Sequence, residues 1–129
     1  MVRILLVALG GACGSVARYG LSGWVHQRYG GAFPAGTLVV NALGCLLIGV
    51  VGALVQERQM FSAYTRLLLV YGLLGGFTTF SSFGYETFEL LRAGSTRLAA
   101  LNTAANVGLG LGAVWLGWAL TRAVVLPAR

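Results

Sequence analysis

The chain has 129 residues, of which 57% are hydrophobic and only 9% are charged, and its mean hydropathy is +0.82. Because a soluble domain carries about 25% charged residues, this composition excludes a soluble globular protein and is typical of an integral membrane protein. The formal charge of +6 comes from scattered arginines without a basic run, which excludes nucleic acid binding and indicates phospholipid headgroups as partners.

The hydrophobic residues fall into four segments separated by short connections. A membrane-spanning helix needs about 20 apolar residues, so each segment is long enough to cross a bilayer. The sequence therefore predicts an all-α integral membrane protein with a single membrane domain over residues 1–129. The approximate spans are 3–25, 33–55, 66–91 and 98–121.

The first segment contains a pair of glycines and one charge. Gly10 and Gly14 form a GxxxG pair, which allows another helix to approach closely. Arg18 is costly at membrane depth unless it reaches water, so it is a functional candidate. An anchor at the helix end is the equally favoured alternative.

The second segment begins near Pro34 and has Asn41 as its one strongly polar residue. An asparagine in a membrane helix often bonds a neighbouring helix, and the alternative is that its amide donates into a pore. Three further glycines predict close helix contacts: Gly44, Gly49 and Gly52.

The third segment has no charge from Leu67 to Tyr85, yet its middle is rich in glycine and hydroxyl groups. Paired glycines are unfavourable in a helix interior, and serine and threonine compete for backbone hydrogen bonds. We therefore expect a broken transmembrane helix, whose freed carbonyls lie between Gly75 and Thr78. After the break, four polar residues share one helical face, with the two glutamates at the mouth: Thr79, Ser82, Glu86 and Glu89.

The third segment ends at Arg92 and Gly94, in a pattern typical of a helix C-cap. In the fourth segment a polar or small stripe recurs every fourth residue, at Asn102, Asn106 and Gly110. Gly108 and Gly112 form a second GxxxG pair there.

The third segment offers ligands for two kinds of ion. The backbone carbonyls of Gly75 and Thr78 are hard oxygen ligands, and no acidic side chain accompanies them, which favours a monovalent, structural cation on a two-fold axis. An anion would meet neutral donors and the positive edges of two aromatic rings, although phenylalanines at this spacing usually serve packing or lipid contact. These anion candidates are Asn41, Thr79, Ser81, Ser82, Phe80 and Phe83.

The arginines divide almost evenly between the two sides that four spans would create, five against four. Positive-inside bias is therefore nearly absent, so the chain can insert in both orientations. Because four short helices leave little room for a pore, we expect a dual-topology antiparallel homodimer with pathways between subunits.

Three stretches make the chain resemble the fluoride channel family called Fluc or CrcB along nearly its full length. They are GGACGSVARY at Gly10–Tyr19, GTLVVNALGCLLIG at Gly36–Gly49 and GLLGGFTTFSSF at Gly72–Phe83. The resemblance implies a dual-topology homodimer in the bacterial plasma membrane, with two antiparallel fluoride pores, a central sodium ion and passive, electrogenic fluoride efflux.

By the same resemblance, sodium is held by the carbonyls of Gly75 and Thr78, and Arg18 lies at an aqueous vestibule. Asn41, Phe80 and Phe83 line the pore. The chain departs from the family at Ser82, where many relatives have threonine. It also departs in the fourth segment, where asparagines and a glycine replace a tyrosine and serines of a polar track: Asn102, Asn106 and Gly110.

Two other functions compete with a channel. A small multidrug exporter is also a four-helix dual-topology dimer, but it needs a carboxylate in the first helix, where this chain has Arg18 and no acid. A structural assembly factor would use the glycines for packing only. The sequence shows no Ser/His pair and no buried carboxylate dyad, so we predict no enzyme.

Overall fold

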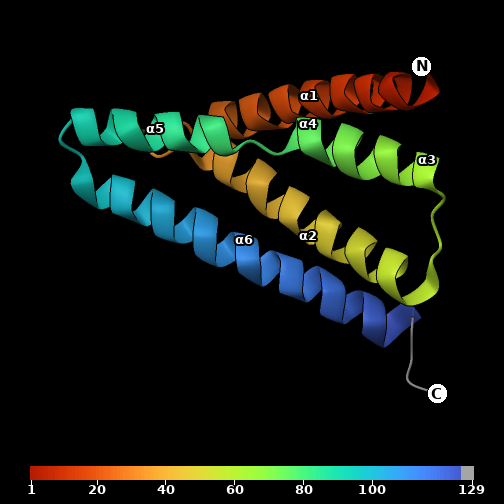
Figure 1. The fold of residues 1–129 in the computed structure, drawn as a ribbon. Coiled ribbons are helices and arrows are strands. Elements are labelled where there is room, and N and C mark those ends of the chain that lie inside the picture. Colours follow the sequence, from red (N-terminus) through yellow and green to blue (C-terminus); the bar gives the residue numbers. More distant parts are fainter. Residues whose placement is uncertain (126–129) are drawn as a thin grey trace.

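The computed structural model describes residues 1–125, except the side chains of residues 57 and 58, and it is entirely helical in regular structure (Figure 1). Four stretches are long and apolar enough to cross a membrane, as predicted for an all-α membrane protein. Three are continuous: α1 (Val2–Tyr29), α2 (Ala35–Arg58) and α6 (Thr96–Val125). The third stretch is composite: α3 (Ala63–Arg66), the π-helical η1 (Leu67–Leu74), α4 (Gly75–Phe77) and α5 (Phe80–Arg92).

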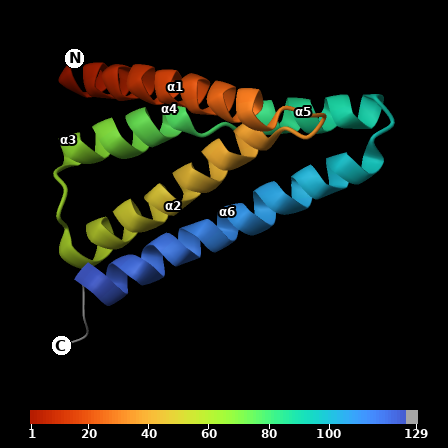
Figure 2. The same ribbon diagram turned by 180° about the vertical axis from the view of Figure 1, so that it is seen from behind.

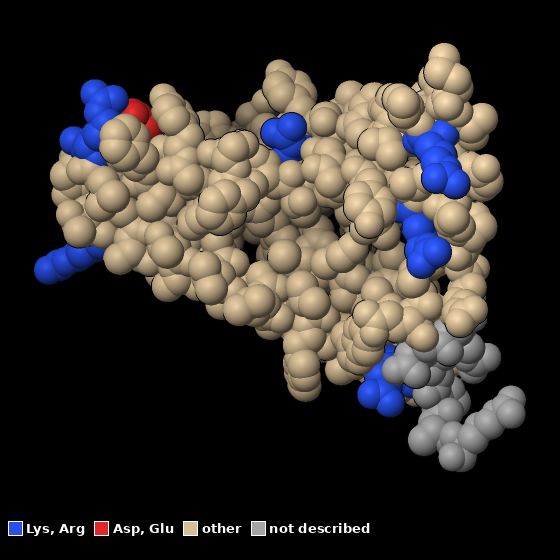
Figure 3. All heavy atoms as spheres, in the orientation of Figure 1, with Lys and Arg blue, Asp and Glu red and all other residues tan. Residues whose placement is uncertain are grey.

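The helices run back and forth, so that the N-terminus and the α2–α3 connection lie at one end of the molecule and the α5–α6 turn at the other (Figures 1 and 2). Helix α2 packs along α6, and α1 packs along η1 and α4. Most arginine atoms lie at the two ends of the visible face, one isolated basic group lies between them, and the rest of the surface between the ends carries no charge (Figure 3). This distribution suits a bilayer with headgroups at both ends.

The turn between α5 and α6 has the predicted capping geometry. Gly94 adopts a φ of +75°, a left-handed conformation that glycine reaches without steric cost. The Ser95 N–H donates to the Leu90 carbonyl at 2.8 Å, and the Gly94 N–H donates to the Leu91 carbonyl at 3.0 Å. These two bonds form a Schellman motif, which confirms the helix end predicted at Arg92 and Gly94.

Glycines bring α1 into backbone contact with the third stretch. A methyl group at Gly10 would meet the Leu68 carbonyl oxygen, and one at Gly14 would meet the Leu73 carbonyl oxygen. A methyl group at Gly76 would lie 2.5 Å from the Gly11 carbonyl oxygen. The close approach predicted for the first GxxxG pair is therefore confirmed.

A second glycine contact joins α2 to α6. A methyl group at Gly49 would meet the Val114 carbonyl, and one at Gly117 would meet the Leu46 carbonyl. Gly52 is looser, since its nearest neighbour is the Trp118 ring at 3.8 Å. The second GxxxG pair, Gly108 and Gly112, faces open space within the described residues.

Replacing Gly14 with alanine tests the packing of α1. The new methyl group would collide with the Leu73 carbonyl and lie 2.8 Å from the Phe77 nitrogen, which are backbone atoms that cannot turn away. We expect the free energy of unfolding in detergent to fall by about 2 kcal/mol. Gly20→Ala is the matched control, because a methyl group there meets nothing within 4 Å. An equal loss in both variants would contradict the packing argument.

Candidate functional site

The helical backbone is interrupted at two threonines. Helix α4 ends at Phe77, and Thr78 (φ −82°, ψ 154°) and Thr79 (φ −149°, ψ 110°) are extended before α5 begins at Phe80. The Thr78 N–H still donates to the Leu74 carbonyl at 3.0 Å, so helical bonding continues past the glycines.

This geometry corrects the role assigned to the paired glycines. Gly75 is helical, with φ −63° and ψ −38°, and Gly76 packs against the Gly11 backbone. The absence of a side chain at Gly76 therefore permits close packing rather than an unusual backbone conformation. The extended residues lie after the glycines, at the hydroxyl-bearing positions.

The amide of Asn41 holds the extended backbone at Thr79. Its Oδ1 atom accepts from the Thr79 N–H at 2.8 Å, and its Nδ2 atom donates to the Thr79 carbonyl at 3.1 Å. In a continuous helix the Thr79 N–H would donate to the Gly75 carbonyl. The Asn41 side chain thus takes the donor that the Gly75 carbonyl would otherwise have.

The Thr79 side chain takes a second N–H group, which a continuous helix would direct to the Thr78 carbonyl. Its Oγ1 atom accepts from the Ser82 N–H at 3.2 Å and donates to the Ser82 Oγ atom at 3.0 Å, which makes Thr79 the N-cap of α5. In a continuous helix the Ser82 N–H would donate to the Thr78 carbonyl. Ser81 Oγ lies 3.2 Å from Thr79 Oγ1 in the same hydroxyl cluster.

Arg18 also bonds the interrupted segment. Its Nε atom donates to the Gly76 carbonyl at 3.1 Å. The positive guanidinium therefore lies at the C-terminal end of α4, where exposed carbonyls carry partial negative charge. Neither interpretation of Arg18 from sequence anticipated this contact.

Phe80 and Phe83 pack edge to face, with ring centroids 5.3 Å apart and ring planes at 61°. The Phe80 side chain is 82% exposed, whereas Phe83 is buried. Both rings line a surface groove of about 390 Å³ together with Asn41 and residues of the interruption. The predicted pathway residues that this groove unites are Asn41, Gly75, Thr78, Thr79, Phe80, Phe83 and Asn106.

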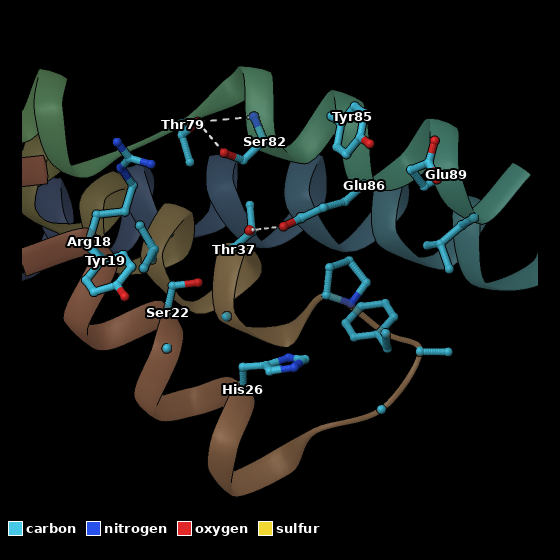
Figure 4. Close-up of a pocket in the computed structure, with 18 of the residues that line it drawn as sticks. Arg18, Tyr19, Ser22, His26, Thr37, Thr79, Ser82, Tyr85, Glu86 and Glu89 are labelled. Atoms are coloured by element: carbon cyan, nitrogen blue, oxygen red, sulfur yellow. Dashed lines mark hydrogen bonds between the residues drawn. The ribbon is translucent and has the colours of Figure 1, made fainter. Parts of the chain in front are cut away.

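A larger cavity of about 880 Å³ lies on the other side of Thr79, between α1, α2 and α5 (Figure 4). The helical face predicted after the break is confirmed, because all four of its residues line this cavity: Thr79, Ser82, Glu86 and Glu89. Arg18 and Ser82 share the cavity, but Ser81 does not line it. Other aromatic and polar side chains of the wall include Tyr19, Ser22, His26, Thr37 and Tyr85.

Glu86 lies deeper than a residue at the mouth. The Thr37 hydroxyl donates to its Oε1 atom at 2.6 Å, as the dashed line in Figure 4 marks. Its Oε2 atom is buried and finds no hydrogen-bond partner among the described residues. Glu89 behaves as predicted for a residue near water, since it forms an exposed ion pair with Arg92 at 3.0 Å.

The polar stripe of the fourth span forms as predicted, but it contacts protein groups. Asn41 Nδ2 donates to Asn106 Oδ1 at 3.1 Å, and Asn106 Nδ2 donates to Asn102 Oδ1 at 2.9 Å. Asn102 Nδ2 then donates to Thr87 Oγ1 at 2.9 Å. Sequence reasoning missed Thr87, although its position four residues after Phe83 places it on the same helical face.

Comparison with known proteins gives one family and many close relatives. Residues 5–118 match the family model described as CrcB-like protein, Camphor Resistance (CrcB). A Rhizobium etli protein is 47% identical over 97% of this chain and 100% of its own length. A Chloroflexus aurantiacus protein is 49% identical over 95% and 97%, and a Roseiflexus protein is 47% identical over 98% and 100%. All three are named "Fluoride-specific ion channel FluC", which describes a channel and not an enzyme.

The fit of Thr78 against α2 can be tested at Gly44. A methyl group at Gly44 would meet the Cγ2 methyl of Thr78, whose hydroxyl donates to the Leu74 carbonyl at 3.0 Å, so Gly44→Ala must shift this anchored side chain. We expect the free energy of unfolding to fall by about 2 kcal/mol. Adding Thr78→Ser removes that Cγ2 methyl and keeps the hydroxyl, so the double variant recovers most of the loss.

Gly52→Ala serves as the control on the same helix, because its nearest contact would be an ordinary 3.8 Å. Thermal unfolding in detergent measures all variants. A double variant no more stable than Gly44→Ala would contradict the proposed contact.

Proposed function

The chain belongs to the CrcB-like family, and we propose that it is a fluoride-selective channel for passive, electrogenic efflux of fluoride from the cytoplasm. The observation that carries the proposal is the interruption at Thr78 and Thr79, which Asn41 holds open beside the Phe80–Phe83 pair. Relatives that share nearly the whole chain are named fluoride-specific ion channels. The comparisons do not favour the multidrug exporter.

The hydrogen bonds divide the proposed pathway residues into two roles. Both Asn41 N–H directions are taken, one by the Thr79 carbonyl and one by Asn106 Oδ1. Asn41 therefore shapes the pathway rather than donating to the ion. Ser82 Oγ accepts from Thr79, which leaves its own O–H to donate into the larger cavity.

Aromatic edges supply the rest of the anion environment in this proposal. The hydrogen edge of a phenylalanine ring carries positive partial charge, and the two rings lie at the groove. Neutral donors and ring edges hold an anion weakly enough to release it, as conduction requires. An interior-negative potential in a bacterial plasma membrane would drive fluoride outward with about 2.3 kcal/mol per 100 mV.

We further propose two antiparallel copies with two pathways. The groove is open on the surface of one subunit, and the Phe80 ring within it is 82% exposed. A second copy would cover this ring and close the groove. The near-even division of arginines between the two ends supports insertion in both orientations.

Sodium is proposed as the structural ion between the two copies. The carbonyls of Gly75 and Thr78 fit a hard monovalent cation, because Asn41 and Thr79 take the N–H groups that a continuous helix would direct to them. Bound sodium would supply a fixed positive charge between the two interruptions. The residues that would hold it contribute neutral backbone oxygens only.

The aromatic pair is tested by fluoride efflux from reconstituted vesicles. We expect Phe80→Ile and Phe83→Ile to reduce fluoride flux at least a hundredfold, because isoleucine has no positive ring edge. Phe88→Ile, at an exposed position on the same helix, is the control and should conduct normally. Normal flux in either test variant would remove the aromatic argument, and that result would favour a packing role.

The same vesicles test the transport mechanism. The unmodified protein should pass fluoride and not chloride, with a rate that follows the membrane potential and ignores an imposed proton gradient. Fluoride uptake driven by the proton gradient would instead indicate coupled exchange and would overturn the channel proposal.

The sodium proposal is tested by replacing Na⁺ on both sides with a large organic cation throughout purification and reconstitution. We expect fluoride flux to fall at least tenfold and to return when Na⁺ is added, because the carbonyls would lose their ligand. Unchanged flux and unchanged subunit association without Na⁺ would exclude a sodium requirement.

A further inference from the structure

Five hydrogen bonds connect Thr79 to Phe83 through side chains of α2, α6 and α5. We call the side chains of Asn41, Asn106, Asn102 and Thr87 the amide ladder. It starts where the Thr79 N–H donates to Asn41 and continues through the two asparagines of α6. It ends where Asn102 donates to Thr87 Oγ1 and Thr87 donates to the Phe83 carbonyl at 2.7 Å.

The bonds all run in one direction. Each amide accepts at its oxygen from the preceding group and donates from its nitrogen to the next. Such a chain polarises its members, so the bonds strengthen one another in a buried setting. Asn106 is held twice, because its Nδ2 atom also donates to the Asn102 carbonyl at 3.0 Å.

The amide ladder is attached at one end to the N-cap of α5, through Asn41, and at the other end to α5 itself, at Thr87. Thr79 caps the helix, and Thr87 lies two turns further on, about 12 Å along the axis. Two attachments to neighbouring helices, one at the cap and one two turns further on, fix the rotation of a helix about its own axis. The rotation of α5 in turn decides where the Phe80 and Phe83 rings point, since both belong to its first turn.

Burial separates Asn102 from any ion in the cavities. Asn102 is 0% exposed, and it lines neither the groove beside Phe80 nor the larger cavity. Asn106 does line the groove, but its amide is engaged by Asn41 and Asn102. The polar stripe of α6 was expected to contact the ion. At Asn102 it contacts other protein groups instead.

We propose that Asn102 and Asn106 are positioning residues, which fix the rotation of α5 and so aim Phe80 and Phe83 at the groove. The proposal rests on the proposed fluoride conduction for its functional meaning, but the hold on α5 can be measured without fluoride. It assigns the asparagines of this chain a role distinct from ion contact.

The test follows the exchange of the Thr79 amide hydrogen with solvent, measured by NMR in detergent micelles. Asn102→Leu keeps the branching and the number of heavy atoms of the side chain and removes two ladder bonds, those to Asn106 and Thr87, neither of which involves Thr79. We expect the Thr79 amide to exchange at least tenfold faster and fluoride flux in vesicles to fall about tenfold. Backbone amides beside Val40 in α2 should keep their exchange rates.

Thr121→Val is the matched control. Thr121 is also buried on α6, and its hydroxyl bonds the Gly117 carbonyl of its own helix at 2.8 Å. We expect this variant to leave Thr79 exchange and fluoride flux unchanged. Equal effects from both variants would show a general loss of stability and would overturn the proposal.

A double variant separates positioning from stability. Asn102→Leu with Thr87→Val removes the polar groups on both sides of one bond, so no buried donor or acceptor is stranded there. We expect its melting temperature to recover relative to Asn102→Leu, while Thr79 exchange and fluoride flux remain altered. Recovery of all three quantities would overturn the positioning role.

The outcomes also distinguish this proposal from the proposed function. Unchanged Thr79 exchange in Asn102→Leu overturns the amide ladder even if fluoride conduction is normal in the unmodified protein. Absence of fluoride flux in the unmodified protein overturns the proposed function, and Thr79 exchange then decides alone whether the ladder holds α5.

Discussion

The pairing of one side-chain amide with one backbone residue organises this protein. Asn41 offers Thr79 both an acceptor and a donor, as a neighbouring β-strand would. Without such a partner, an extended residue at membrane depth would leave its N–H and carbonyl unsatisfied, at a cost of several kcal/mol. The interruption, the hydroxyl cluster and the groove beside Phe80 all depend on this pairing.

Much of the fold could be predicted from the sequence, because the bilayer imposes strong rules on length and composition. The four spans, the Gly94 cap and the close approach at Gly10 and Gly14 follow from local patterns. The family is shown by the comparisons. Dimer formation, sodium and the direction of transport stay predictions, since they concern a second chain, an ion and a membrane potential.

The details of the site were harder to predict, for a physical reason. Gly75 and Gly76 looked like helix breakers, yet Gly76 serves contact with α1, and whether a glycine breaks a helix or packs it depends on a neighbour distant in sequence. Arg18 and Glu86 likewise found partners in other helices, the Gly76 carbonyl and Thr37. Spacing along one segment carries no information about such partners.

The π-helical segment η1 has a consequence for how the chain tolerates change. Its hydrogen bonds reach one residue further back than those of an α-helix, so Leu67–Leu74 holds surplus chain length. Removing a single residue there would let the segment tighten into an α-helix, and because the wider π turns accommodate that residue now, α4 would stay close to its present rotation. Gly76 would then still face Gly11, and its carbonyl would remain within reach of Arg18. The third stretch can thus lose one residue within η1 and keep its register against α1.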